Sequence, residues 1–149
     1  MFLDVLAAVD ASPAAERVAA TAADLARAFH ARLTLLSVAA DLPTYAYNAA
    51  VDVRRLEEEA TAEADRTVRA AAALVPQDVS VRTVVRHGQP GREIVREAEA
   101  GAHDLIVLGS RGRGKVAAGL FGSVVGDVHF HTRIPLLIVP PAGGEDVLD

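Results

Sequence analysis

The sequence contains no cysteine, so neither a disulfide framework nor a thiolate metal site is available to it. It also has no apolar stretch near the ~20 residues that a membrane-spanning helix requires. The first ten residues, MFLDVLAAVD, lack a cationic start and are interrupted by Asp4 and Asp10, so they do not resemble a signal peptide. From these absences we expect a cytoplasmic protein with no membrane partner.

An excess of positive charge is missing as well. The formal net charge is −5, whereas surfaces that bind nucleic acids are usually basic, so we expect no nucleic-acid partner. The 149 residues, with 51% hydrophobic content, suffice for one buried core. We therefore expect one domain over residues 1–141 and a poorly ordered tail over residues 142–149.

Apolar runs of strand length alternate with longer stretches of helical periodicity. The runs predict five strands, over residues 2–9, 32–39, 79–85, 104–109 and 134–139. The longer stretches predict helices over residues 13–30, 51–75, 90–100 and 123–131, with a loop over residues 41–50. We expect Ser12 to cap the first helix, because Pro13 follows it as a first-turn proline.

The alternation of strands and helices predicts right-handed crossovers onto a parallel sheet. The third strand alternates apolar and polar residues, and Pro135 lies near the start of the fifth, so both are expected at edges. The simplest order is 3-2-1-4-5, an open, Rossmann-like α/β sheet with helices on both faces. In that order the carboxyl ends of strands one and four, at Asp10 and Gly109, open a crevice where such sheets bind ligands.

A glycine-rich segment, GSRGRGKVAAGLFGSV, follows the fourth predicted strand. It does not match a P-loop, because Val116 stands where the magnesium-binding hydroxyl belongs. The Rossmann fingerprint fails too, since the turn after the first strand is DASPA. A third pattern, G-x2-G-x9-G-[ST], is satisfied by Gly109, Gly112, Gly122 and Ser123.

With this pattern the chain resembles the ATP-binding branch of the universal stress protein family. Further landmarks in the same order are Asp10 after the first strand, Val38 at the end of the second, the G-x-P-x-x-x-I motif from Gly88 to Ile94, and the closing IPLLIVP. The resemblance implies that Asp10 bonds the ribose hydroxyls and that the backbone of Val38 reads adenine. It places Gly109 beneath the ribose.

The resemblance also implies the remaining contacts. Around the phosphates it places Gly112, Gly122, Ser123 and Val124. By its charge alone, Arg111 is also expected to neutralise the phosphates. Ala8 stands at the site where some ATP-binding relatives have proline. The implied ligand is ATP or another adenine nucleotide, with Mg²⁺, and the implied assembly is a homodimer through residues 134–139. No catalytic residue and no metal-ligating residue is implied.

Elementary chemistry favours an anion at the glycine loop. Glycine reaches positive φ and lets backbone N–H groups come close to phosphate oxygens. Ser123 is expected to begin a helix, where free amides and the helix dipole attract negative charge.

Several residues also have simpler interpretations. Asp10 could serve only as a helix-entry cap, the glycines could mark only turns, and Arg111, Arg113 and Lys115 could be solvated charges. Tyr45 and Tyr47 could stack on adenine or only cover the surface. His87 is expected as a strand-end residue, and His129 and His131, two apart on a helix, do not share a face for a metal.

Two other functions stay open at this point. One is a slow ATPase or phosphotransferase on the same fold, although no carboxylate or histidine near the loop is evidently placed as a general base. The other is a dimerisation module with an empty pocket, which the intact glycine spacing disfavours.

Overall fold

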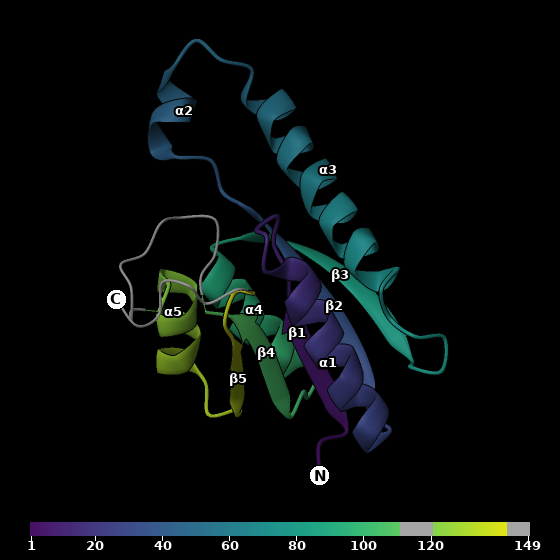
Figure 1. Cartoon of the computed structure of the whole chain (residues 1–149). Coiled ribbons are helices and arrows are strands. Elements are labelled where there is room, and N and C mark those ends of the chain that lie inside the picture. Colours follow the sequence, from purple (N-terminus) through teal and green to yellow (C-terminus); the bar gives the residue numbers. More distant parts are fainter. Residues whose placement is uncertain (111–120, 143–149) are drawn as a thin grey trace.

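The computed structural model describes residues 1–110 and 121–142. Five parallel strands form one sheet in the order β3-β2-β1-β4-β5, as the sequence predicts (Figure 1). Their bounds are Asp4–Ala8 for β1, Arg32–Ala40 for β2, Val81–Gly88 for β3, Leu105–Gly109 for β4 and Leu136–Val139 for β5. The prediction that β3 and β5 lie at the two edges is therefore confirmed.

Helices cover both faces of the sheet, which also confirms the predicted fold class. The bounds are Ala15–Phe29 for α1, Thr44–Asn48 for α2, Val53–Ala72 for α3, Pro90–Ala100 for α4 and Ser123–His131 for α5. Buried residues of α1 and α3 pack on one face, whereas α4 and α5 pack on the other. The two hydrophobic clusters that result are separated by the strands themselves.

Two details differ from the sequence-based expectation. The helix α2 lies within residues 41–50, which were predicted as a loop; with five residues after Pro43, it is too short to show helical periodicity. Ser12 does not cap α1, because the helix begins three residues later, with Ala14 at the N-cap and no side-chain capping bond. The chain between Asp10 and Ala14 is instead a separate turn.

Strand alternation decides which cluster each side chain joins. In β2, Leu33 and Leu35 face α1 and α3, whereas Leu36 and Val38 face α4 and α5. In β1, Leu6 and Ala8 face the same way as Leu36. The same alternation continues to the carboxyl ends of the strands, where it positions the side chains of the candidate site.

The amino ends of the strands are joined by polar bonds. The carboxylate of Asp104 accepts hydrogen bonds from the backbone N–H groups of Leu3 and Asp4, at 2.8 and 3.0 Å. The guanidinium of Arg32 bonds both oxygens of Asp4, at 2.8 and 2.9 Å. This hydrogen-bonded pairing lowers the pKa of Asp4. β1, β2 and β4 are thus linked at the end of the sheet opposite the crevice.

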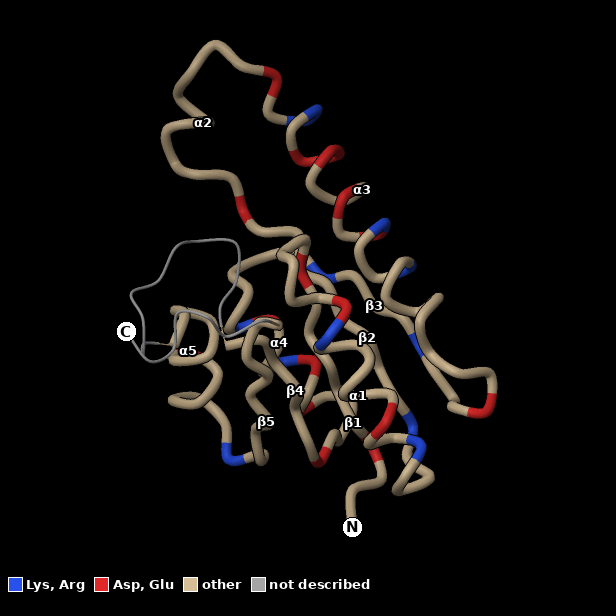
Figure 2. The backbone as a smooth tube through the Cα atoms, viewed as in Figure 1, with Lys and Arg blue, Asp and Glu red and all other residues tan. Residues whose placement is uncertain are grey.

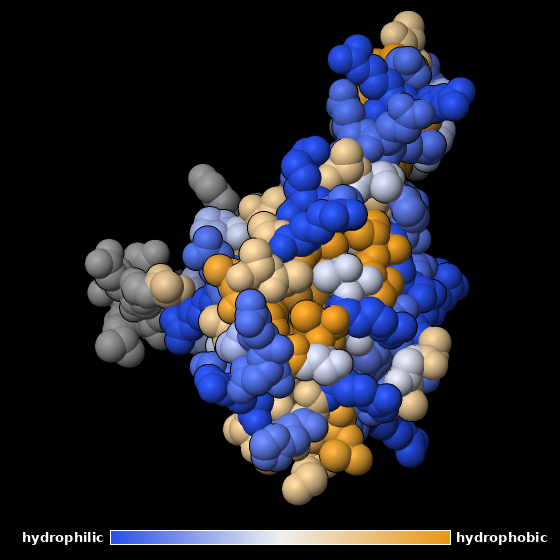
Figure 3. Space-filling model, turned by 90° about the vertical axis from the view of Figure 1, so that its right-hand side faces the viewer, coloured by the Kyte–Doolittle hydropathy of each residue, from blue (hydrophilic) through white to orange (hydrophobic). Residues whose placement is uncertain are grey.

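At the carboxyl end, α2 and the first half of α3 project beyond the strands (Figure 1). Charged residues of both signs follow α3 along its length (Figure 2), and the projecting arm carries mostly hydrophilic side chains (Figure 3). Ion pairs between helix neighbours, such as Arg54 with Glu58, lie on its surface. Within the described residues, no helix is both long and apolar enough to cross a membrane. Except for residue 142, the predicted tail lies outside the described residues.

Candidate functional site

A cavity of about 440 Å³ opens at the carboxyl ends of β1, β2 and β4. Its size is in the range of small-molecule sites. The structure brings together seven of the residues singled out from the sequence, and all of them line this cavity: Ala8, Asp10, Val38, Gly109, Gly122, Ser123 and Val124. The other two, Arg111 and Gly112, lie outside the described residues, as do Arg113 and Lys115. The cavity is thus at the predicted crevice.

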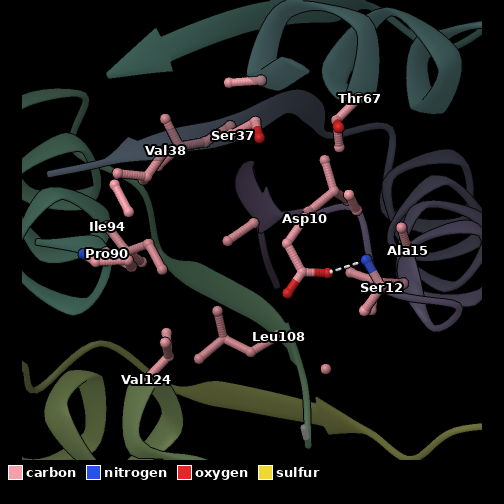
Figure 4. A pocket seen from close by; sticks show the side chains of 18 of the residues that line it. Asp10, Ser12, Ala15, Ser37, Val38, Thr67, Pro90, Ile94, Leu108 and Val124 are labelled. Carbon is pink, nitrogen blue, oxygen red and sulfur yellow. Dashed lines mark hydrogen bonds between the residues drawn. The ribbon is translucent and has the colours of Figure 1, made fainter. Parts of the chain in front are cut away.

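Asp10 follows β1 and reaches into the middle of the cavity (Figure 4). Its Oδ1 accepts a hydrogen bond from the backbone N–H of Ser12 at 2.9 Å, which fixes the turn into α1. The side chain is not the N-cap, because that position belongs to Ala14. Its Oδ2 makes no hydrogen bond with the described residues, so one carboxylate oxygen stays available to a ligand.

β2 continues beyond the end of β1, and Val38 lies in the part of β2 that β1 does not pair with. Leu36 accepts a hydrogen bond from the N–H of Val9 at 2.8 Å, and the last paired residues of β1 and β2 are Ala8 and Leu36. Because backbone groups of alternate residues point to the same side of a strand, the N–H and C=O of Val38 point past the end of β1. Neither group has a backbone partner in the described parts of the chain.

The ends of the glycine-rich segment are fastened to the sheet. The N–H of Gly122 donates to the carbonyl of Ser110 at 2.9 Å, and the N–H of Ser110 donates to the carbonyl of Val139 at the same distance. Gly122 has a φ of −65°, which is in the ordinary negative range. Among the described glycines, Gly88 has the positive φ, 139°, where the chain turns from β3 into α4.

The first turn of α5 forms one wall of the cavity. Gly122 is its N-cap and makes no side-chain capping bond, and Ser123 is the first helical residue, as predicted. The N–H of Gly126 is the first that donates within the helix, to the carbonyl of Gly122 at 3.2 Å. The amides of residues 123–125 therefore have no partner within the helix and are donors suited to an anion.

Pro90 and Ile94 of α4 close the cavity on the same side. A partly buried ion-pair cluster joins α4 to β3: Arg86 donates to Glu93 at 3.0 Å and to Glu97 at 2.7 Å. The hydrogen bond to Glu93 is the main cause that raises the pKa of Arg86. The wall formed by α4 is therefore set by contacts that lie outside the cavity.

Sequence reasoning missed the wall that α3 supplies. Ala60, Glu63, Ala64 and Thr67 line the cavity, together with Ser37 of β2. No described lining residue is Lys or Arg, and the charged ones are Asp10 and Glu63. In the described part of the site, a negative ligand group would be held by backbone amides.

The remaining candidates lie elsewhere. Tyr45 and Tyr47 belong to α2 and do not line the cavity; the Tyr47 hydroxyl donates to Glu57 at 3.1 Å, and this bond raises the pKa of Tyr47. His87 is the residue before the last of β3, near the strand end as expected, and its ring bonds the hydroxyl of Thr61 at 2.9 Å. The described residues include no group of three His, Asp or Glu side chains that could hold a metal.

Known proteins are similar to this chain in sequence over nearly its whole length. The sequence matches the model of the universal stress protein family over residues 1–140. It is 34% identical over 143 residues to the universal stress protein in the QAH/OAS sulfhydrylase 3′ region of Thermus aquaticus, covering 93% of this chain and 99% of that protein.

Solved structures share the fold. Universal stress protein UspA from Lactobacillus plantarum has a TM-score of 0.74 at 26% identity, covering 93% of this chain and 97% of that one. The universal stress protein from Archaeoglobus fulgidus in complex with dAMP has a TM-score of 0.66 at 23% identity, with the same two coverages.

Proposed function

The chain belongs to the universal stress protein family, and from that premise we propose that it is an ATP-binding regulatory protein of the cytoplasm that acts as a homodimer. The observation that carries the proposal is the convergence of seven predicted residues, from three strand ends and one helix start, on one cavity. The fold also accommodates an adenine nucleotide in another protein, the dAMP complex from Archaeoglobus fulgidus.

In the proposed complex, the N–H and C=O of Val38 read the edge of adenine. Adenine presents an acceptor nitrogen beside its amino donor, which complements a peptide N–H beside a C=O. The open oxygen of Asp10 accepts from a ribose hydroxyl, and the amides of residues 123–125 hold the phosphates. Each such bond to a charged group contributes about 1.5–3 kcal/mol. We propose that Mg²⁺ arrives on the triphosphate, because the described residues lack a metal-binding group.

Binding without turnover is the simplest activity of such a site. The acidic side chains among the described lining residues are Asp10 and Glu63, and Asp10 is assigned here to the ribose. General-base catalysis requires a group within hydrogen-bond reach of the attacking water. Glu63 belongs to α3, on the opposite face of the sheet from α5, where the phosphates are assigned, so this assignment supplies no base. The proposed output is therefore a change in conformation or partner on binding.

Mass spectrometry of the nucleotide released from heat-denatured, purified protein tests the proposal directly. We expect ATP or another adenine nucleotide. In calorimetry, Gly122→Val should abolish ATP binding, because a side chain at the N-cap of α5 occupies the space that the phosphates require. Gly126→Val is the matched control in the same helix, since a Cβ there meets no atom within 4 Å.

Unchanged ATP affinity in a folded Gly122→Val protein would refute this assignment of the phosphate site. Steady phosphate release at about one per second, within the range of ordinary enzymes, would favour an ATPase instead.

A further inference from the structure

The residues that line the cavity belong to both faces of the sheet, and we call the two parts of the cavity its first and second lobes. The first lies against α4 and α5 and includes Val38, Ile94 and Val124. The second lies between α1 and α3, where Val18 and Ala64 are buried. Asp10 lies between the two, as Figure 4 shows. The residues assigned above to a mononucleotide leave the second lobe without an occupant.

Ser37 is the feature of the second lobe that points to a ligand. It is adjacent to Val38 in β2, so its side chain faces the opposite side of the sheet, toward α1 and α3. The residue is only 4% exposed, and its hydroxyl makes no hydrogen bond with the described residues. Both Ser37 and Thr67 line the cavity, and their hydroxyls lie on the same side of it (Figure 4). The Ser37 hydroxyl is accessible from the cavity and uses none of its hydrogen-bonding capacity on the described residues, so a ligand atom in the second lobe can bond it.

The walls of the second lobe restrict what that ligand group is. Ala15 of α1 and the methyl groups of Ala60 and Ala64 of α3 leave a narrow apolar space between the helices. The charged groups at its border that the structure describes are Asp10 and Glu63, and both are acidic. An anionic group is therefore disfavoured, whereas an uncharged flat ring with hydrogen-bonding heteroatoms fits the methyl walls and the hydroxyls.

We infer that the second lobe binds the second nucleoside of a dinucleoside polyphosphate, with its base between α1 and α3 and the hydroxyls of Ser37 and Thr67 bonding its heteroatoms. The inference rests on the proposed nucleotide function. It adds to that function a preference for ligands with two nucleosides over ATP. The first nucleoside takes the lobe of Val38, and the phosphates between the two nucleosides contact the start of α5.

Calorimetry with ATP and with di(adenosine-5′) tetraphosphate tests the inference. The native protein should bind the dinucleotide at least about tenfold more tightly than ATP, the difference expected from one additional well-packed group. Thr67→Val keeps the shape of the side chain and removes its hydroxyl, so it should reduce dinucleotide affinity about fivefold and leave ATP affinity unchanged. Thr61→Val is the matched control, because Thr61 lies on the same helix but faces His87 outside the cavity.

Ala60→Leu provides a steric test that does not depend on one hydrogen bond. Ala60 is half-buried, and the larger side chain should fill the second lobe. We expect it to remove the advantage of the dinucleotide while ATP still binds as in the native protein. Circular dichroism melts establish that each variant is folded.

Three results would overturn the inference. Equal affinity of the native protein for both ligands would show that the second lobe contributes nothing. Equal losses of both ligands in Thr67→Val and Ala60→Leu would place the mononucleotide itself in that lobe. Binding of neither ligand to the native protein would refute the proposed nucleotide function together with the inference, whereas ATP binding without a dinucleotide advantage refutes the inference alone.

Discussion

The two carboxylate oxygens of Asp10 have different surroundings. One oxygen accepts from Ser12 and fixes the turn into α1, while the other is open. The two oxygens therefore have separate roles that one substitution removes together. An effect on the turn would alter stability, whereas an effect on a ribose hydroxyl would alter affinity, and the two are measured separately.

We predict that Asp10→Ala weakens ATP binding by about 1–3 kcal/mol through lost ribose bonds. Inorganic triphosphate should bind as before, because its contacts are expected at α5. Calorimetry with both ligands measures the difference, and Asp24→Ala, an exposed carboxylate on α1, is the control. A similar loss for both ligands would place Asp10 on the phosphates.

At the scale of residues, the site residues that could be predicted from the sequence are those at or just after the carboxyl ends of strands. Asp10, Val38 and Gly109 could be singled out because parallel strands bring their carboxyl ends to one edge. Ser37 and Thr67 could not, because their importance depends on how far α3 lies from α1 at the end of the sheet. That spacing is set by tertiary packing, and no local pattern encodes it.

Among the elements, β5 is an edge strand of the sheet whose apolar side chains are incompletely covered. Leu136, Leu137 and Ile138 are only partly buried, and the strand contains no charged residue. An apolar edge of this kind pairs readily with another strand. The proposed homodimer would pair two copies of β5 antiparallel about a two-fold axis and cover both edges at once.

Light scattering at micromolar concentration checks this proposal. We predict a mass of about twice the 15.6 kDa of the chain, and a shift toward monomer or aggregate in Ile138→Asp. Val81→Asp is the control, because Val81 lies on β3 at the opposite edge and is also partly exposed. A native mass near 15.6 kDa, with or without ATP, would exclude a stable dimer.

Long helices could be predicted from the sequence, whereas the shortest one could not. The 20 residues of α3 and the 15 of α1 show a clear helical period, and the edge character of β3 and β5 sufficed to order the sheet. The five residues of α2 span little more than one turn, which is too short for a periodic pattern. The start of α1 was misplaced because the bond between Asp10 and Ser12 forms a turn where a cap was expected.

For the whole molecule, the pH dependence of stability follows from one buried imidazole. His103 is 7% exposed, and both of its ring nitrogens are buried without a hydrogen-bond partner among the residues that the structure describes. Burial is the main cause that lowers the pKa of His103; Arg82 also lowers it, whereas Asp4 and Glu97 act in the opposite direction. The unfolded chain therefore binds this proton more readily than the folded protein does.

We predict that this residue makes the protein less stable as the pH falls below 6.5, the ordinary pKa of histidine. At higher pH the imidazole is neutral in both states and contributes no pH dependence. The unfolding midpoint of the native protein should fall between about pH 7 and about pH 5, and His103→Leu should reduce that fall. His129→Gln, at an exposed histidine, should behave like the native protein. An identical fall in His103→Leu would assign the effect to other groups.

The bonds among Asp4, Arg32 and Asp104 lie at the opposite end of the strands from the cavity. These bonds therefore join β1, β2 and β4 away from the cavity. Substitutions at Ser37, Thr67 or Ala60 can change what is bound without weakening those bonds. Laboratory selection for new ligands can therefore vary the carboxyl ends of the strands and keep Asp4, Arg32 and Asp104 unchanged.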